Sequence, residues 1–94
     1  MPVYVVTWEL NKEKPNYQAA RKAFVEHIDR YTHTKDPGLD SVRFISTTWT
    51  PSEVRDDLKK KLDANDRLFL CQINSRQNDG WLSQPVWDWI NSKT

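Results

Sequence analysis

The sequence predicts one α+β domain whose strands and helices alternate along the chain. Segments rich in β-branched and aromatic residues, which are typical of strands, alternate with segments whose apolar residues recur every three or four positions, as in amphipathic helices. The chain has 94 residues, the length of a single domain with no room for a second core. The sequence therefore predicts a single domain over residues 1–94.

The first half of this pattern is a strand followed by a helix. Residues 3–10, Val-Tyr-Val-Val-Thr-Trp-Glu-Leu, predict a strand that is largely apolar on both faces. Such a strand is expected to be central in its sheet and covered on both sides. Residues 17 to about 30 predict an amphipathic helix, with Asn16 as its N-cap.

The middle of the chain predicts two strands and a second helix. Residues 31–35 are β-prone but short, residues 36–38 (Asp-Pro-Gly) indicate a turn, and residues 41–48 predict another strand. The segment Thr50-Pro51-Ser52-Glu53 is typical of a capping box with proline at the first helical position. The helix that it opens is expected to run to about residue 62, with Asp57 on its solvated side facing Lys61.

The last third predicts a strand and a short helix. Residues 67–74 form the strand, and Cys71 is expected to be an inert thiol in its apolar face. Ser83 is the expected cap of a helix over residues 84–92. The resulting order, β-α-β-β-α-β-α, matches the ferredoxin-like split βαβ plan with an added C-terminal helix. Helices then cover one sheet face, and a second copy of the chain is the simplest cover for the other, which predicts a homodimer.

Composition limits the classes of partner. Fourteen basic and thirteen acidic residues give a net charge of +1, which argues against a generally basic nucleic-acid-binding surface. No apolar run approaches the roughly 20 residues that span a bilayer, and no signal peptide is visible, so no membrane partner and a cytoplasmic location are expected. The single cysteine cannot form an internal disulfide. Five tryptophans are more aromatic surface than so small a core needs.

Five short motifs are spread over nearly the whole chain. They are residues 3–11 (Val-Tyr-Val-Val-Thr-Trp-Glu-Leu-Asn), Leu39-Asp40-Ser41, Glu53-Val54-Arg55-Asp56, Asn65-Asp66-Arg67-Leu68 and Trp87-Asp88-Trp89-Ile90. Together they resemble small proteins described as SinR-like, which are relatives of the CRISPR-associated endoribonuclease subunit and of VapD-type toxins. This resemblance implies a ferredoxin-like fold and a homodimer.

The resemblance also implies a candidate metal site. In the nuclease branches of that family, an Asp at the end of the first strand holds a divalent cation that assists RNA or DNA phosphodiester cleavage. Glu9 stands at this position here, and its carboxylate could hold Mg²⁺ or Mn²⁺. The longer side chain favours weak or no catalysis. His33 is a second catalytic candidate, because it precedes the Leu39-Asp40-Ser41 segment, where some relatives carry a His.

Two sets of residues are candidates for binding. Arg21, Lys22, Arg30 and Arg43 are the candidate phosphate contacts, and solvated helix faces are the alternative interpretation. Trp8, Trp87 and Trp89 are the candidate dimer contacts. Trp81, Trp87 and Trp89 could stack on bases, and the alternative is that Trp87 or Trp89 packs the last helix on the sheet or on the partner subunit.

Three functional hypotheses follow. The first is a homodimeric structural or binding module with weak or no catalysis. The second is a Mg²⁺- or Mn²⁺-dependent endonuclease that uses Glu9. The third is a dimer from a mobile element that binds another protein.

Overall fold

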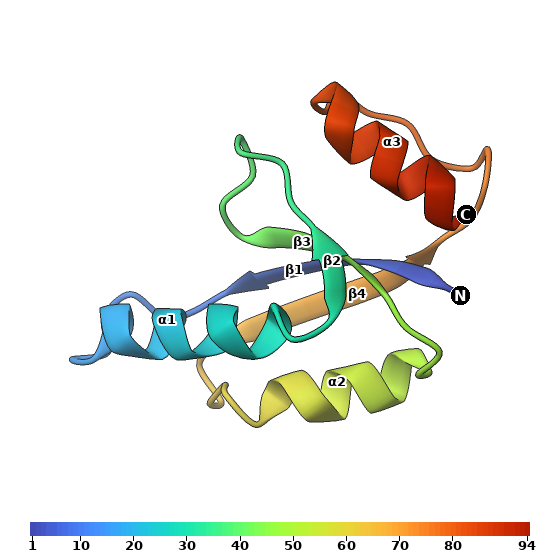
Figure 1. The fold of residues 1–94 in the computed structure, drawn as a ribbon. Helices are drawn as coiled ribbons and strands as arrows, with labels where there is room; N and C mark the ends of the chain where they lie inside the picture. Colours follow the sequence, from blue (N-terminus) through green and yellow to red (C-terminus); the bar gives the residue numbers. More distant parts are fainter.

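A computed structural model describes all 94 residues, and its elements follow the predicted order. Four strands and three helices are present (Figure 1): β1 (Val3–Glu9), α1 (Tyr17–Ile28), β2 (Thr32–Thr34), β3 (Val42–Ser46), α2 (Pro51–Lys59), β4 (Arg67–Ile73) and α3 (Gln84–Lys93). The predicted ends differ by one to three residues. The α+β class is confirmed.

The strands form one antiparallel sheet with the order β2-β3-β1-β4. The prediction that the first strand is central is confirmed, because β1 pairs with β3 along one edge and with β4 along the other. Strand β4 is an edge strand along its full length of seven residues. The position of each residue on one sheet face or the other follows from this register.

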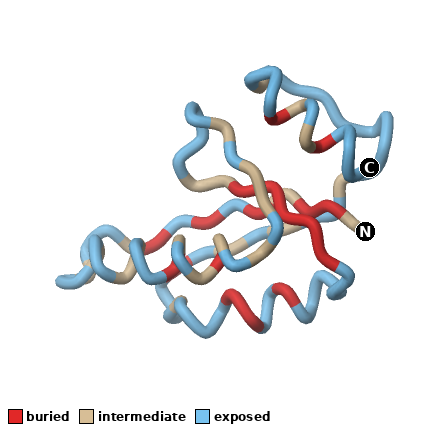
Figure 2. The backbone as a smooth tube through the Cα atoms, in the orientation of Figure 1, coloured by how far each residue is buried: buried red, intermediate tan, exposed pale blue.

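One face of the sheet, called the inner face, is covered by α1 and α2 (Figure 1). Its core joins Tyr4, Val6 and Trp8 of β1 to Phe24 and Ile28 of α1, and to residues of β3 and α2. The Trp8 and Phe24 rings pack with centroids 4.9 Å apart. The buried backbone segments follow the two central strands and the helix surfaces that face them (Figure 2).

The opposite face, called the outer face, carries α3 (Figure 1). Val86 and Ile90 of α3 pack on Phe44 of β3 to form a second, smaller core. The turn before β3 anchors the start of this helix, because the Asp36 carboxylate accepts a 2.7 Å hydrogen bond from the backbone amide of Ser83. The expectation that helices cover only one face was therefore wrong: the last helix contributes apolar residues that cover part of the other face.

Of the three predicted helix caps, the one at Thr50 is confirmed as a capping box. The Thr50 hydroxyl accepts from the Glu53 amide at 3.2 Å, and the Glu53 carboxylate accepts from the Thr50 amide at 2.9 Å. Asn16 and Ser83 occupy the other two cap positions, but neither side chain forms a capping hydrogen bond. At Ser83 the carboxylate of Asp36 binds the backbone amide instead.

Candidate functional site

Glu9 lies at the end of β1 on the outer face, where its side chain is exposed. Lys12 lies at 4.0 Å from its carboxylate, and both side chains are largely solvated, so the pair is weak. No group of three or more His, Cys, Asp or Glu side chains capable of holding a metal forms anywhere in the chain. Glu9 is therefore a single carboxylate within one copy of the protein.

The structure does not bring His33 together with Glu9. His33 pairs with Ile45, which pairs in turn with Tyr4, so Glu9 lies five residues further along the sheet, or about 17 Å. The two side chains also belong to opposite faces. A shared catalytic centre within one copy is excluded by this register.

The partners of His33 are structural. Its Nδ1 lies 2.8 Å from the Tyr31 carbonyl oxygen, and its Nε2 lies 3.5 Å from the Asp29 carboxylate. Asp29 also accepts a 2.9 Å hydrogen bond from Nε of Arg43. These contacts tie the end of α1 to β2 and β3.

Arg43 is buried, unlike an arginine that binds phosphate from solvent. Its guanidinium lies 5.5 Å from the centre of the Trp8 ring, in a cation–π contact, and it donates to Asp29 and to the Val42 carbonyl. Because Arg43 points to the inner face, the helices cover it. In the structure it is a component of the core.

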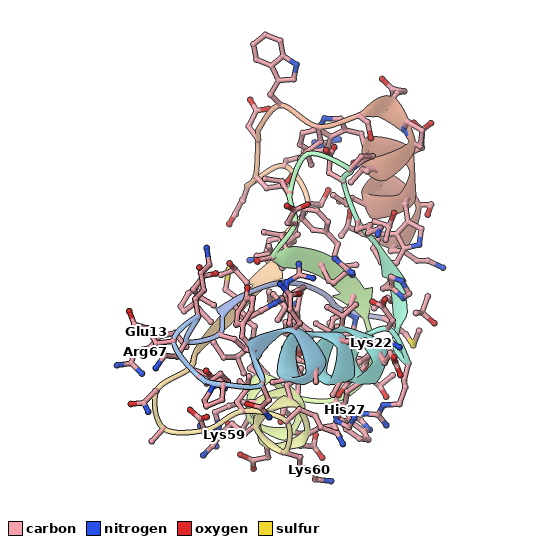
Figure 3. All side chains as sticks on the ribbon, turned by 90° about the vertical axis from the view of Figure 1, so that its left-hand side faces the viewer. Glu13, Lys22, His27, Lys59, Lys60 and Arg67 are labelled. Carbon is pink, nitrogen blue, oxygen red and sulfur yellow. The ribbon has the colours of Figure 1, made fainter.

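The other three basic candidates do not converge on one surface. Arg30 at the end of α1 donates to the Asp57 carboxylate at 2.6 Å. Arg21 donates to the Asp40 carbonyl at 3.1 Å, and Lys22 lies 3.8 Å from Glu26 on the same helix. Figure 3 shows Lys22 on α1, away from the lysines at the end of α2. Solvated helix faces, the alternative interpretation, describe these residues well.

The carboxylate of Asp57 is buried between α1 and α2, where donor side chains surround it. This Asp57 cluster was not predicted from the sequence. Asp57 is not solvated beside Lys61, as expected, but turned inward and almost fully buried. It accepts hydrogen bonds from the Tyr31 hydroxyl at 2.7 Å and from Arg30, and His27 Nε2 lies 3.1 Å from it. The sequence did contain a signal for this inward position. Asp57 follows Val54 by about one helical turn and directly precedes Leu58, so it lies on the same helix face as these two buried residues.

The ionisation of this cluster follows from its contacts. Burial raises the pKa of Asp57, but the Tyr31 hydrogen bond and the interactions with His27 and Arg30 outweigh burial and hold the pKa below its ordinary value. Burial, with the hydrogen bond to Asp57, raises the pKa of Tyr31. Asp57 is therefore a charged acceptor that fastens the two helices together.

Asp66, from one of the five motifs, has a similar structural role. Its carboxylate accepts from the backbone amides of Asn11 and Asp63 at 2.8 and 3.0 Å and from Lys14 at 2.9 Å. Burial raises its pKa, and these three hydrogen bonds outweigh that effect and hold the pKa low. This network joins the loop after β1 to the turn before β4.

The three candidate tryptophans have different positions. Trp8 is only 3% exposed, because it faces α1, so it belongs to the core and has no surface to offer a second copy. Trp87 and Trp89 are partly buried on α3, where they pack against the outer-face core. This position matches the alternative interpretation, packing of the last helix.

Part of the outer face is left uncovered. Phe69 of β4 is 63% exposed, and its neighbours on this face, Thr7 and Cys71, are exposed as well. We call these three residues the open patch. The expectation of a core position for Cys71 was wrong, because Cys71 lies on the edge strand β4 and its side chain remains exposed.

Fold and site together define a small α+β domain with one helix-covered sheet face and one half-covered face. Comparison with protein-family models, with curated proteins and with solved structures finds no match for this chain. No helix is both long enough and apolar enough to cross a membrane.

Proposed function

We propose that this chain is a binding module on the ferredoxin-like plan and that its open patch docks onto a second copy of itself. The plan is supported by the strand order β2-β3-β1-β4, by the antiparallel pairing and by α1 and α2 on one face. The observation that carries the docking proposal is the exposure of Phe69, in the middle of an ordered edge strand.

The surroundings of Phe69 favour association through this face. Val5 and Val42, both half-buried, extend the apolar surface beyond the open patch. An aromatic side chain of this size contributes much of the energy of a small interface when it becomes buried. Strand β4 also presents an unpaired edge, which a second chain can cover.

The charges at one end of the patch suit a symmetric contact. Glu9 and Arg67 are direct cross-strand partners, and both are exposed. In a twofold dimer each surface meets its own copy, so Arg67 of one chain can face Glu9 of the other. A self-complementary pair of this kind selects one register and opposes others.

Light scattering over a range of concentrations tests the proposal. With increasing concentration, the measured mass of the wild-type protein is expected to approach twice the chain mass of 11.2 kDa. The measured mass of Phe69→Ser is expected to remain near the mass of a single chain. Trp81→Ser is the matched control, because it removes an even more exposed aromatic residue that lies outside the sheet. A wild-type protein that stays monomeric at millimolar concentration, or a Phe69→Ser variant that associates like the wild type, would refute the proposal.

Metal-assisted phosphodiester cleavage is the second candidate, and one observation favours it. Glu9 lies on the same face as the open patch, so a dimer axis near this end brings two Glu9 carboxylates to one place. Carboxylate oxygens are the ligands that Mg²⁺ and Mn²⁺ prefer. Such a site is complete only in the dimer.

Incubation of structured RNA and duplex DNA with Mn²⁺ tests this candidate. Metal-dependent cleavage is expected to disappear in Glu9→Gln and to persist in Glu13→Gln, a nearby exposed carboxylate used as the control. Cleavage that is equal in both variants, or absent from the wild type, excludes a catalytic Glu9.

A further inference from the structure

A pocket of about 320 Å³ lies on the outer face, between the end of β4, the loop that follows it and α3. Its apolar floor and walls come from the sheet and from the chain around α3: Val5, Phe44, Ile73, Leu82, Trp87 and Ile90. The apolar lining is typical of small-molecule sites, and the volume lies at the lower end of their range of roughly 300 to 1,000 Å³. The pocket is separate from the Asp57 cluster and from Glu9.

The rim of this pocket is polar but carries little charge. Gln77 and Asn78 of the loop contribute amides, and Asp79 contributes a carboxylate. Asn78 Nδ2 donates to the Asn74 carbonyl at 2.8 Å, and the Asp79 carboxylate accepts from the Gly80 amide at 2.8 Å. No lysine, arginine or histidine lines the pocket, so an anionic ligand finds no charge partner there.

We propose that this pocket binds an uncharged heteroaromatic base with an exocyclic amino group, and that adenine is its best match. The Trp87 ring offers an apolar aromatic wall for a planar ligand, as in base stacking on tryptophan. Asparagine and glutamine amides are the side chains that pair with the N6 and N7 edge of adenine, and a carboxylate accepts a hydrogen bond from an amino group. The lining selects the base and makes no provision for a phosphate.

A substitution at Gly80 can fill the pocket from its wall. A Cβ added at Gly80 would have the Trp87 ring, 4.0 Å away, as its nearest neighbour, which is an ordinary van der Waals distance. The φ angle of Gly80 is not positive, so the backbone at this position suits an L-residue. Gly80→Leu therefore places a side chain beside Trp87, in the space that the base would occupy.

Calorimetric titration with adenosine is the first test. Wild type and Trp81→Ser, in which the altered residue is 99% exposed and lies outside the pocket lining, are expected to bind equally. Gly80→Leu is expected to lose binding, and Trp87→Ala to weaken it by about 5- to 150-fold, the range for loss of one stacking partner. No adenosine binding to the wild type, or unchanged binding to Gly80→Leu, would overturn the proposal.

Two further ligands test the chemistry of the rim. Uridine, which lacks the amino group, is expected to bind more weakly than adenosine, and AMP is expected to bind no more tightly. Equal binding of uridine would contradict recognition by the rim. Tighter binding of AMP would contradict a site for an uncharged base.

Cys71 provides an independent readout, because it lines the pocket and is the only cysteine in the chain. Adenosine is expected to slow the reaction of this thiol with a thiol-specific reagent in the wild type but not in Gly80→Leu. Repeating the measurement in Phe69→Ser separates this proposal from docking through the open patch. If adenosine still slows the reaction of Cys71 in Phe69→Ser, the result supports the pocket. If adenosine slows the reaction in neither the wild type nor Phe69→Ser, the result contradicts the proposal.

Discussion

Replacing Phe24 by alanine is expected to lower the free energy of unfolding by about 3–5 kcal/mol. The Phe24 side chain is fully buried between α1 and the sheet and packs on Trp8, whose ring centre is 4.9 Å away. Its removal loses apolar burial and leaves a cavity in a tightly packed interior. Because domains of this size are stable by roughly 5–15 kcal/mol, the loss is a large fraction of the total.

Urea unfolding measures this effect, and the chain contains its own matched control. Phe69→Ala makes the same chemical change at an exposed position and is expected to alter the free energy of unfolding by about 0.5 kcal/mol or less when the protein is dilute enough to be monomeric. Equal losses for the two variants would mean that the inner-face core is wrongly assigned.

Replacing Asp57 by alanine is expected to cost about 2–3 kcal/mol of unfolding free energy. The change leaves the half-buried Tyr31 hydroxyl without its carboxylate acceptor, whereas His27 Nε2 keeps its contact with the backbone carbonyl of residue 57, 3.0 Å away. The value is below that of a fully buried ion pair, because the Arg30 side chain is 53% exposed and can be solvated. Asp56→Ala is the control, since that carboxylate is solvated and pairs only with Arg55; it should change stability by less than about 1 kcal/mol.

The low pKa of Asp57 also sets a pH dependence. A carboxyl group whose pKa is lower in the folded than in the unfolded state stabilises the fold fully above its unfolded pKa of about 3.9. This contribution disappears as the pH falls through the folded-state pKa. Between pH 7 and pH 3, the free energy of unfolding in urea is expected to fall less for Asp57→Asn than for the wild type. An equal loss would show that Asp57 does not contribute to acid sensitivity.

The strands and helices were predictable because local patterns determine them. The two-sided apolar character of residues 3–10 predicted a central strand, and Thr50-Pro51-Ser52-Glu53 predicted where α2 begins. The position of α3 was not predictable, because its apolar residues indicate only that it packs on something. Its place on the outer face is fixed by contact with Phe44 and by the hydrogen bond from the Ser83 amide to Asp36, which are far apart in the sequence.

The roles of individual polar residues were harder to predict than the elements. The alternation of side chains along β3 places Arg43 on one face of the strand, but only the tertiary structure shows that this face brings it against Asp29 and Trp8. Asp57 looked solvated because a lysine follows it by one turn, although Tyr31 and Arg30 compete more effectively for its carboxylate. Cys71 looked buried because its strand face is apolar, yet it lies on the edge strand and its side chain is exposed.

The most direct test of docking through the open patch is a series of ¹H–¹⁵N spectra of the wild-type protein at increasing concentration. Backbone amides of Thr7, Phe69 and Cys71 and their strand neighbours are expected to shift with concentration, while amides of α1 and α2 remain in place. The same series for Phe69→Ser is expected to show no such shifts. Concentration-dependent shifts confined to α1 and α2, or spectra of the wild type that do not change at all, would contradict the account.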